Sequence, residues 1–260
     1  MVRRPLGNHH HGPDTLLVTS ETTTDTTTGT AAQLREPLRR ARVVLWDFDG
    51  PICRLFARHT AERVAAGLVE WLAGRGLPGL LDDTEREAVD PHVVLRAVDR
   101  RHPGSDLVVE LEERLTKEEL RAAASALPTA WADPLIRTWT AVGSRLAITT
   151  NNSPRVVRAY LDTRGLTSCF TPHIYGRTTD LHLLKPDPYC LNRALSAMGT
   201  APSAALMIGD SPSDLAAARE ARVPFLGYAR NERKAKLLRE AGAEQVVTSL
   251  EPLLLSLRHR

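Results

Sequence analysis

Two aspartates one residue apart lie at the end of a short apolar run. Residues 43–48 predict a strand, and Asp47 and Asp49 alternate with Phe48 in the segment LWDFDGPIC. Side chains two positions apart in a strand project to the same side. Two carboxylates about 4 Å apart repel each other by about 4 kcal/mol at an effective dielectric constant near 20. The pair therefore indicates a bound cation, a shared proton or a chemical task.

Polar side chains also follow three later stretches of the chain. Thr150 ends the run LAITT and Asn151 follows it, Lys185 lies in LHLLKPDPY, and the run ALMIG leads into Asp210 and Asp214. In open α/β sheets, ligands bind beyond the carboxyl ends of the strands, beside helix N-termini that favour anions. We therefore expect these side chains to meet the two aspartates at one edge of a sheet.

The chemistry of this set is that of phosphoryl transfer. Four carboxylates in one pocket repel one another, which requires a divalent cation, and oxygen ligands favour Mg²⁺. Lys185 and the Thr150 hydroxyl can contact the oxygens of a phosphate. Asp47 can attack phosphorus to form an acyl phosphate. Asp49, whose pKa neighbouring carboxylates would raise, can protonate the leaving oxygen and then activate water.

Each stretch by itself also has a simpler explanation. The aspartate pair before Gly50 and Pro51 can form Asx-type turns, and a capping box accounts for Ser211 and Asp214. Lys185 by itself can be a solvated side chain. Only the ordered occurrence of all four stretches at the ends of predicted elements favours a site.

The pattern of apolar runs predicts an α/β fold with a doubly wound parallel, Rossmann-like sheet. Near-continuous apolar runs separated by helical patterns are typical of strands that are buried on both faces. The predicted strands are Val43–Phe48, Arg145–Thr150, Pro172–Tyr175, Ala205–Gly209, Val223–Tyr228 and Gln245–Val247. No strand is predicted between Cys53 and Gly143, where four amphipathic segments predict helices instead.

These patterns divide the chain into a leader, a core and an insertion. Residues 1–40 are rich in threonine and predict a disordered leader. Residues 41–54 and 139–260 form the predicted core domain, and residues 55–138 form a helical cap domain inserted after the first strand. Three tryptophans are interpreted as part of the cap core: Trp71, Trp131 and Trp139.

Composition limits the other classes of function. A net charge of +3 over 260 residues does not argue for nucleic acid as a partner. Three cysteines without metal-ligand spacing or a Cys-x5-Arg motif favour a reduced, cytoplasmic setting and exclude a cysteine-dependent phosphatase. No run approaches the ~20 apolar residues of a membrane span, so no membrane partner is expected.

The four stretches together resemble the motifs of the haloacid dehalogenase-like (HAD) superfamily, in the same order. They read Asp47-Phe-Asp49-Gly50, Thr150-Asn151, Lys185-Pro186 and Gly209-Asp210-Ser-Pro-Ser-Asp214. The resemblance implies that Asp47 is the nucleophile, Asp49 the acid and base, and Thr150, Asn151 and Lys185 the phosphate-binding residues. It also implies Mg²⁺ bound by Asp47, the main-chain carbonyl of Asp49, and Asp210, with Asp214 as a ligand or an outer partner. The insertion resembles the cap of the phosphoglycolate phosphatase and β-phosphoglucomutase branch.

Within this superfamily, the residues favour hydrolysis of a small phosphorylated metabolite. Dehalogenases lack the second aspartate, which is present here as Asp49, and a phosphonatase would need a cap lysine, for which only Lys117 is available. Pro51, where the family usually has Thr or Val, stiffens the connection to the cap. A sugar-phosphate mutase and a catalytically silent HAD-like binding protein remain alternatives. A receiver-type signalling module is disfavoured. In such modules the phosphorylated aspartate lies in the sequence between the acidic pair and the threonine, whereas in this chain the additional aspartates come last.

Overall fold

The structure, a computed structural model, describes residue 38 and residues 40–258. The predicted leader therefore lies almost entirely outside the described residues. The strands are β1 (Val43–Trp46), β2 (Cys53–Arg54), β3 (Leu127–Pro128), β4 (Arg145–Thr149), β5 (Ile174–Tyr175), β6 (Ala205–Gly209), β7 (Phe225–Tyr228) and β8 (Val246–Val247). Six of them form a parallel sheet in the order β5-β4-β1-β6-β7-β8. These are the six predicted strands, which confirms the α/β fold class.

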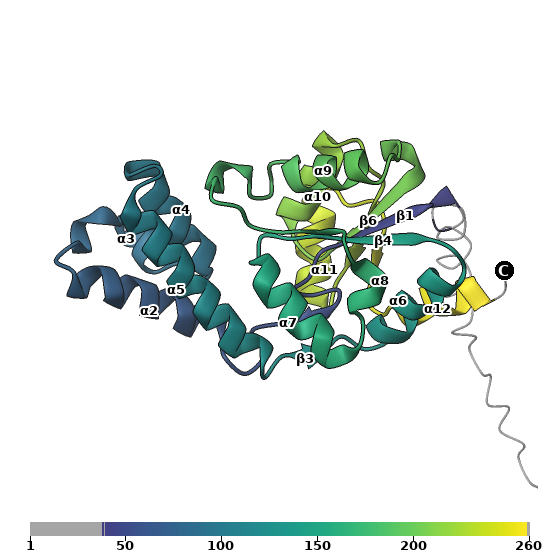
Figure 1. The fold of residues 1–260 in the computed structure, drawn as a ribbon, viewed down its shortest axis with the longest axis horizontal. Helices are drawn as coiled ribbons and strands as arrows, with labels where there is room; N and C mark the ends of the chain where they lie inside the picture. Colours follow the sequence, from purple (N-terminus) through teal and green to yellow (C-terminus); the bar gives the residue numbers. More distant parts are fainter. Residues whose placement is uncertain (1–37, 39, 259–260) are drawn as a thin grey trace, which may run out of the picture.

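Helices connect these strands and cover both faces of the sheet. The α-helices are α2 (Ala61–Gly74), α3 (Asp83–Arg86), α4 (Pro91–Arg101), α5 (Asp106–Ala123), α6 (Ala132–Ala141), α7 (Pro154–Arg164), α8 (Thr167–Phe170), α9 (Tyr189–Ala197), α10 (Pro212–Glu220), α11 (Glu232–Glu240) and α12 (Glu251–Arg258). In the described part of the chain, the short 3₁₀ helices are η1 (Pro78–Leu80), η2 (Leu181–Leu183) and η3 (Pro202–Ala204). Figure 1 shows α9 and α10 on one side of the sheet and α6, α7, α8 and α12 on the other.

The alternation of side chains along β1 decides which helices each face buries. Val44 and Trp46 point into one apolar cluster, which includes buried residues of α6, α7, α8 and α12. Val43 and Leu45 point into a second cluster, with α9 and α10. Successive residues of a strand face opposite sides of the sheet, and every residue of β1 is buried. β1 therefore needs apolar residues at all four positions, which explains the continuous run before Asp47.

Helices α2–α5 form a separate bundle beside the sheet (Figure 1). Helices α2, α4 and α5 share an apolar cluster, in which Leu68, Leu95 and Leu111 are fully buried. Leu181 and Leu184 of the sheet domain also belong to this cluster. The helix starts are encoded locally: the side chain of Asp90 accepts a hydrogen bond from the His92 N–H at the start of α4, with Pro91 at its first position. This bundle corresponds to most of the predicted cap.

A two-stranded ribbon connects the bundle to the sheet domain. β2 pairs antiparallel with β3, so that Cys53 lies opposite Pro128 and Arg54 opposite Leu127. The chain leaves the sheet domain along one strand and returns along the other. No strand was predicted here, because a strand of two residues carries no recognisable alternation of apolar and polar side chains.

Helix α6 begins within the predicted cap, which ends at residue 138, but packs on the sheet domain. Its buried residues Leu135, Ile136 and Trp139 belong to the apolar cluster on the α6 side of the sheet. The Trp139 ring lies edge-to-face against Trp46 of β1, with 5.6 Å between ring centroids. Trp131 is 44% exposed. The interpretation of these two tryptophans as cap core was wrong, because the amphipathic pattern of a helix shows that one face is buried but not which surface covers it.

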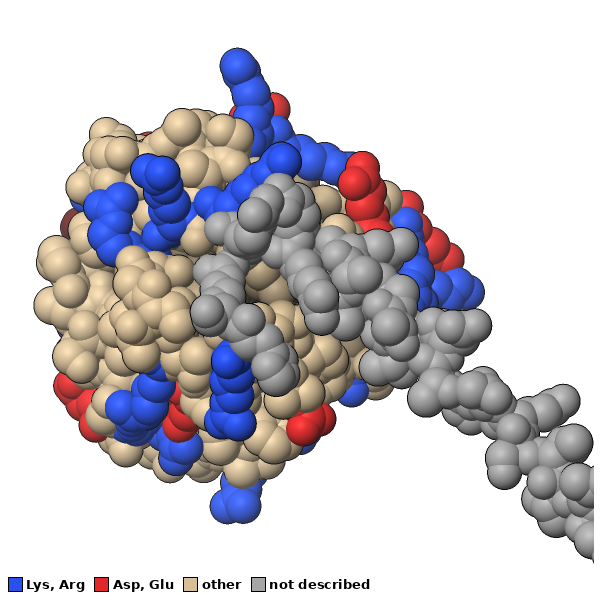
Figure 2. Space-filling model, turned by 90° about the vertical axis from the view of Figure 1, so that its right-hand side faces the viewer, with Lys and Arg blue, Asp and Glu red and all other residues tan. Residues whose placement is uncertain are grey.

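On the face drawn in Figure 2, charged side chains of both signs are present. Figure 2 shows Lys and Arg side chains around the rim of one end of the molecule, with Asp and Glu side chains among them. Within the described residues, no helix is both long enough and apolar enough to cross a membrane.

Candidate active site

Lys185 joins two of the predicted site aspartates at the carboxyl edge of the sheet. Its Nζ donates to Oδ1 of Asp47 at 2.8 Å, to Oδ1 of Asp214 at 2.5 Å and to the Thr149 carbonyl at 2.9 Å. The lysine is only 2% exposed. A buried ammonium is stable only with such partners. Burial alone would lower the pKa of Lys185, but Asp214 and Asp47 outweigh it and raise this pKa, so the side chain is cationic.

Asp210 completes the acidic group from the end of β6. Its carboxylate contacts the ammonium group of Lys234, which lies on α11. Gly50 makes this position possible, because a Cβ atom there would lie 2.3 Å from Cγ of Asp210, and its φ of +121° favours glycine. A larger residue at position 50, directly after the aspartate pair, would therefore clash with Asp210.

Three carboxylates lie close enough to share one cation. Asp47, Asp210 and Asp214 each offer an oxygen, and these oxygens lie within 4.8 Å of one another. All three residues are buried. Carboxylate oxygens are the ligands that Mg²⁺ prefers in proteins, and the chemistry of this donor set fits that ion. The Asp49 side chain is not part of this group.

The buried carboxyl groups have raised pKa values. Burial, and then repulsion from Asp214, raise the pKa of Asp47 to about 7, with Lys185 acting in the opposite direction. Burial also raises the pKa of Asp210 to about 7, against the effect of Lys234. A cation bound at this site would lower the pKa values of these carboxyl groups and so favour their ionised forms.

The Asp49 side chain points toward the ribbon that leads to the cap. Its Oδ1 accepts a hydrogen bond of 2.8 Å from the main-chain N–H of Leu55. Burial raises the pKa of Asp49 to about 6, although this hydrogen bond lowers it. A carboxyl group with a pKa near the working pH can both give and accept a proton. The geometry thus suits Asp49 to the acid and base role that the sequence predicts.

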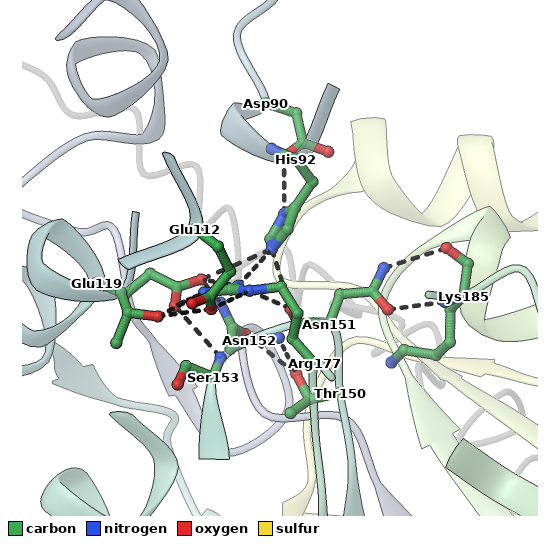
Figure 3. Close-up of polar contacts among 11 residues, drawn as sticks. Asp90, His92, Glu112, Glu119, Thr150, Asn151, Asn152, Ser153, Arg177 and Lys185 are labelled. Atoms are coloured by element: carbon green, nitrogen blue, oxygen red, sulfur yellow. Dashed lines mark hydrogen bonds and ion pairs between the residues drawn. The ribbon is translucent and has the colours of Figure 1, made fainter. Parts of the chain in front are cut away.

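The two predicted phosphate-binding residues after β4 lie in different surroundings (Figure 3). The Asn151 side chain clamps the main chain of Lys185, with Oδ1 accepting from its N–H at 2.7 Å and Nδ2 donating to its carbonyl at 3.1 Å. The Thr150 hydroxyl donates to Oδ1 of Asn152 at 3.1 Å. Thr150 is 2% exposed and does not line the cavity described next, so its predicted contact with phosphate stays a prediction.

A cavity of about 380 Å³ lies between the cap and the sheet domain over the acidic group. Asp47, Asp49 and Lys185 line it from the sheet side, and Asp90 and His92 line it from the start of α4. A second cavity of about 180 Å³ shares Asp49, Asp210 and Lys234 with it and is also lined by Arg54 and Arg230. The acidic group is therefore open to a small ligand, with basic side chains nearby.

Several residues around the site were not predicted. Lys234 is one of only four lysines in the chain, and that scarcity was the one available signal. The loop after β4 is contacted by His92, Glu119 and Arg177, and the Lys185 carbonyl by Arg96. The sequence contexts of these four residues are those of ordinary helical or loop residues. Arg54, in β2, lines the second cavity.

The fold and this set of buried carboxylates and lysine define a class of protein. The profile of the haloacid dehalogenase-like hydrolase family matches residues 41–222. The chain belongs to this family. This confirms the resemblance seen in the four sequence motifs.

Individual proteins are similar to this chain to different extents. A phosphoglycolate phosphatase of Rhodospirillum rubrum is 39% identical over 113 residues, which cover 42% of this chain and 45% of that protein. One of Pseudomonas savastanoi pv. phaseolicola is 28% identical over 222 residues, covering 82% and 78%. The chain spans about half the length of the first curated relatives that it matches. The crystal structure of a predicted phosphatase from Clostridium acetobutylicum has a TM-score of 0.61 at 16% identity, covering 84% of this chain and 98% of that one, and shares the fold.

Proposed function

We propose that this protein is a Mg²⁺-dependent phosphatase that hydrolyses a small phosphorylated metabolite through an aspartyl-phosphate. The observation that carries the proposal is the buried contact of Asp47 with Lys185, beside Asp210 and Asp214 and below a cavity of about 380 Å³. Such a site holds a nucleophile, a cation for the phosphoryl oxygens and carboxylates for a metal ion. The expected cytoplasmic location stays a prediction.

The proposed reaction has two steps. In the first, a carboxylate oxygen of Asp47 attacks phosphorus, the bond to the ester oxygen breaks, and Asp49 gives its proton to that leaving oxygen. In the second, Asp49 takes a proton from water, and the resulting hydroxide attacks phosphorus and releases the Asp47 carboxylate. The ammonium group of Lys185 lies where it can stabilise negative charge on the phosphoryl oxygens.

Mg²⁺ would be held by Asp47 and Asp210, with Asp214 as a ligand or an outer partner and the main-chain carbonyl of Asp49 as a further ligand. When bound, it would supply the positive charge that allows the carboxylates and a phosphoryl group to occupy one buried site. Lys234 contacts Asp210 in the structure and therefore competes with a cation for that carboxylate.

The substrate we propose carries a second anionic group besides its phosphate. Arg54, Arg230 and Lys234 line the cavity of about 180 Å³ that adjoins the acidic group. Two relatives are described as phosphoglycolate phosphatases, whose name denotes a phosphorylated acid. Both observations favour a small phosphorylated acid or a bisphosphate over a neutral phosphate ester.

The test is phosphate release by the native protein and by Asp47→Asn, with Mg²⁺ or with a chelator. Substrates are an aryl phosphate, phosphorylated acids and sugar phosphates. We expect turnover that needs both Asp47 and Mg²⁺ and a higher kcat/KM for the phosphorylated acids. Unchanged activity of Asp47→Asn would exclude the aspartyl-phosphate, and a protein inactive on every ester would favour the silent binding protein. Isomerisation of a sugar phosphate without net phosphate release would identify a mutase instead.

A further inference from the structure

One face of cap helix α4 contacts the main chain of both Asn151 and Lys185. His92 and Arg96 are four residues apart and therefore share a helix face. His92 Nε2 lies 3.1 Å from the Asn151 carbonyl oxygen, and Arg96 Nη2 donates to the Lys185 carbonyl oxygen at 2.6 Å. Because Asn151 and Lys185 are also clamped to each other, the cap holds this pair at two points.

Both ring nitrogens of His92 have polar partners. Nδ1 lies 3.0 Å from a carboxylate oxygen of Asp90, and Nε2 faces the carbonyl of Asn151. Both partners accept hydrogen bonds only, and a carboxylate oxygen of Glu119 lies 3.6 Å from Nε2, so these contacts favour an imidazolium with two donors. Arg177 Nη1, which can only donate, lies 3.3 Å from the same Nε2 and acts in the opposite direction. The side chain is 12% exposed, which keeps water from replacing these contacts.

A buried ion pair also holds this loop, and its Arg177 contacts the same Asn151 carbonyl oxygen as His92 (Figure 3). Arg177 is fully enclosed, and its five N–H donors all have acceptors: Oε1 of Glu112, both carboxylate oxygens of Glu119, the Thr116 hydroxyl and the Asn151 carbonyl. Glu119 belongs to cap helix α5 and is 0% exposed.

The second role of Glu119 is to hold the residues that follow Asn151. Its carboxylate accepts from Nδ2 of Asn152 at 2.9 Å and from the Ser153 N–H at 3.2 Å. The Arg177 N–H donates to the Asn152 carbonyl at 3.0 Å. Gly176 permits this approach, because a Cβ atom there would lie 2.5 Å from the Asn152 carbonyl oxygen. Residues of both the cap and the sheet domain thus hold the loop of residues 151–153 in place.

We propose that His92, Arg96 and Arg177 are positioning residues, which hold the main chain of Asn151 and Lys185 so that the phosphate site forms only with the cap docked. The inference rests on the proposed function, because it assumes that these two residues bind the substrate's phosphate. According to this proposal, the cap helps to form the phosphate site as well as covering it.

The experiment compares matched pairs of variants. His92→Leu removes the donor to Asn151, whereas His92→Gln keeps an N–H near the position of Nε2. Arg96→Met removes the donor to Lys185, whereas Arg96→Lys keeps one. Arg155→Met is the control, because Arg155 also joins the sheet domain to α5, through Glu113 at 2.7 Å, but is exposed and does not touch the loop.

We expect His92→Leu and Arg96→Met to raise both KM and the inhibition constant of inorganic phosphate by about tenfold or more, with a smaller fall in kcat. His92→Gln and Arg96→Lys should recover most of this loss. Arg177→Lys keeps the buried positive charge but loses some of the hydrogen bonds that Arg177 makes to the loop. This variant should raise KM and the inhibition constant of inorganic phosphate by an intermediate amount. The proposal is overturned if the first two variants change phosphate inhibition no more than Arg155→Met does.

Hydrogen exchange measures the same positioning without any activity. In His92→Leu and Arg96→Met, peptides covering residues 150–154 and 184–187 should exchange faster than in the native protein and in Arg155→Met. Equal exchange in all of them overturns the inference. If the native protein hydrolyses no phosphate ester but these peptides respond as expected, the proposed function fails while the positioning stands.

Discussion

Nζ of Lys185 lies 2.8 Å from Oδ1 of Asp47, although the two residues are 138 positions apart in the chain. This contact places a buried cation beside the proposed nucleophile. Burial and the neighbouring Asp214 raise the pKa of Asp47, whereas Lys185 lowers it. The lysine therefore favours the ionised form, in which the carboxylate can attack phosphorus.

Replacing Lys185 tests this role directly. Lys185→Met should lower kcat/KM by about 10²–10³, because it removes charge stabilisation at the phosphoryl group and leaves Asp47 and Asp214 without their buried cation. Steady-state kinetics at saturating Mg²⁺ measures the effect. Lys236→Met is the matched control, since Lys236 is 73% exposed and pairs only with Glu240 among the described residues. Equal losses in both variants would contradict the assignment.

The role of Asp49 predicts a dependence on the leaving group. In Asp49→Asn, an aryl phosphate, whose leaving oxygen needs little protonation, should still phosphorylate Asp47 and give a burst of one phenolate per protein. Subsequent turnover should fall by about 10²–10⁴, because no base remains to activate water. An alkyl phosphate should give neither burst nor turnover. Rapid mixing measures the burst, and equal rates for the two esters would argue against Asp49 as the acid.

The contact between Lys234 and Asp210 predicts how the protein responds to metal. Lys234→Met should lower the Mg²⁺ concentration required for half-maximal activity, by roughly threefold to tenfold, because the ammonium group no longer competes for the carboxylate. Asp210→Asn should raise that concentration. Mg²⁺ titrations after treatment with a chelator measure both, with Lys236→Met as the control. A higher Mg²⁺ requirement in Lys234→Met would show that Lys234 supports the site instead.

The surroundings of His92 predict a loss of stability at alkaline pH. Burial by itself would lower the pKa of His92, but Asp90, followed by Glu119, outweighs it and raises this pKa to about 9, while Arg177 lies nearby as a cation. A group whose pKa is raised on folding contributes stability that is complete below its unfolded pKa of about 6.5 and is lost as pH rises through the folded value. The free energy of unfolding should therefore fall between about pH 6.5 and 9, by an amount of the order of 3 kcal/mol.

Urea unfolding of the native protein and of His92→Gln measures this effect. The carboxyl groups of the active site titrate in part of the same range, so the difference between the two proteins isolates His92. That difference should shrink as pH rises from about 6.5 and should be small above about 9. A difference that stays constant from pH 6 to 10 would mean that His92 is neutral in the folded protein.

The positions of the six sheet strands could be predicted from the sequence. Strands that are buried on both faces need continuous apolar runs, and helical patterns between them left few other arrangements. The same logic placed Asp47, Lys185, Asp210 and Asp214 near one another, because the carboxyl ends of parallel strands share an edge of the sheet. The strand positions and the residues at the strand ends can both be recognised from short segments of the sequence.

Only the tertiary structure decided which surfaces those patterns meet. The amphipathic pattern of α6 did not show that Trp139 packs on Trp46 rather than in the cap. Nor did any local signal mark Lys234, Arg177, Glu119 or His92, because each is an ordinary residue of its own segment. Their importance comes from contacts between segments far apart in the chain, such as the 58 positions between Glu119 and Arg177. Hydrogen bonds and ion pairs of this kind form only where the complete fold brings two segments within contact distance. The sequence of either segment alone does not show this.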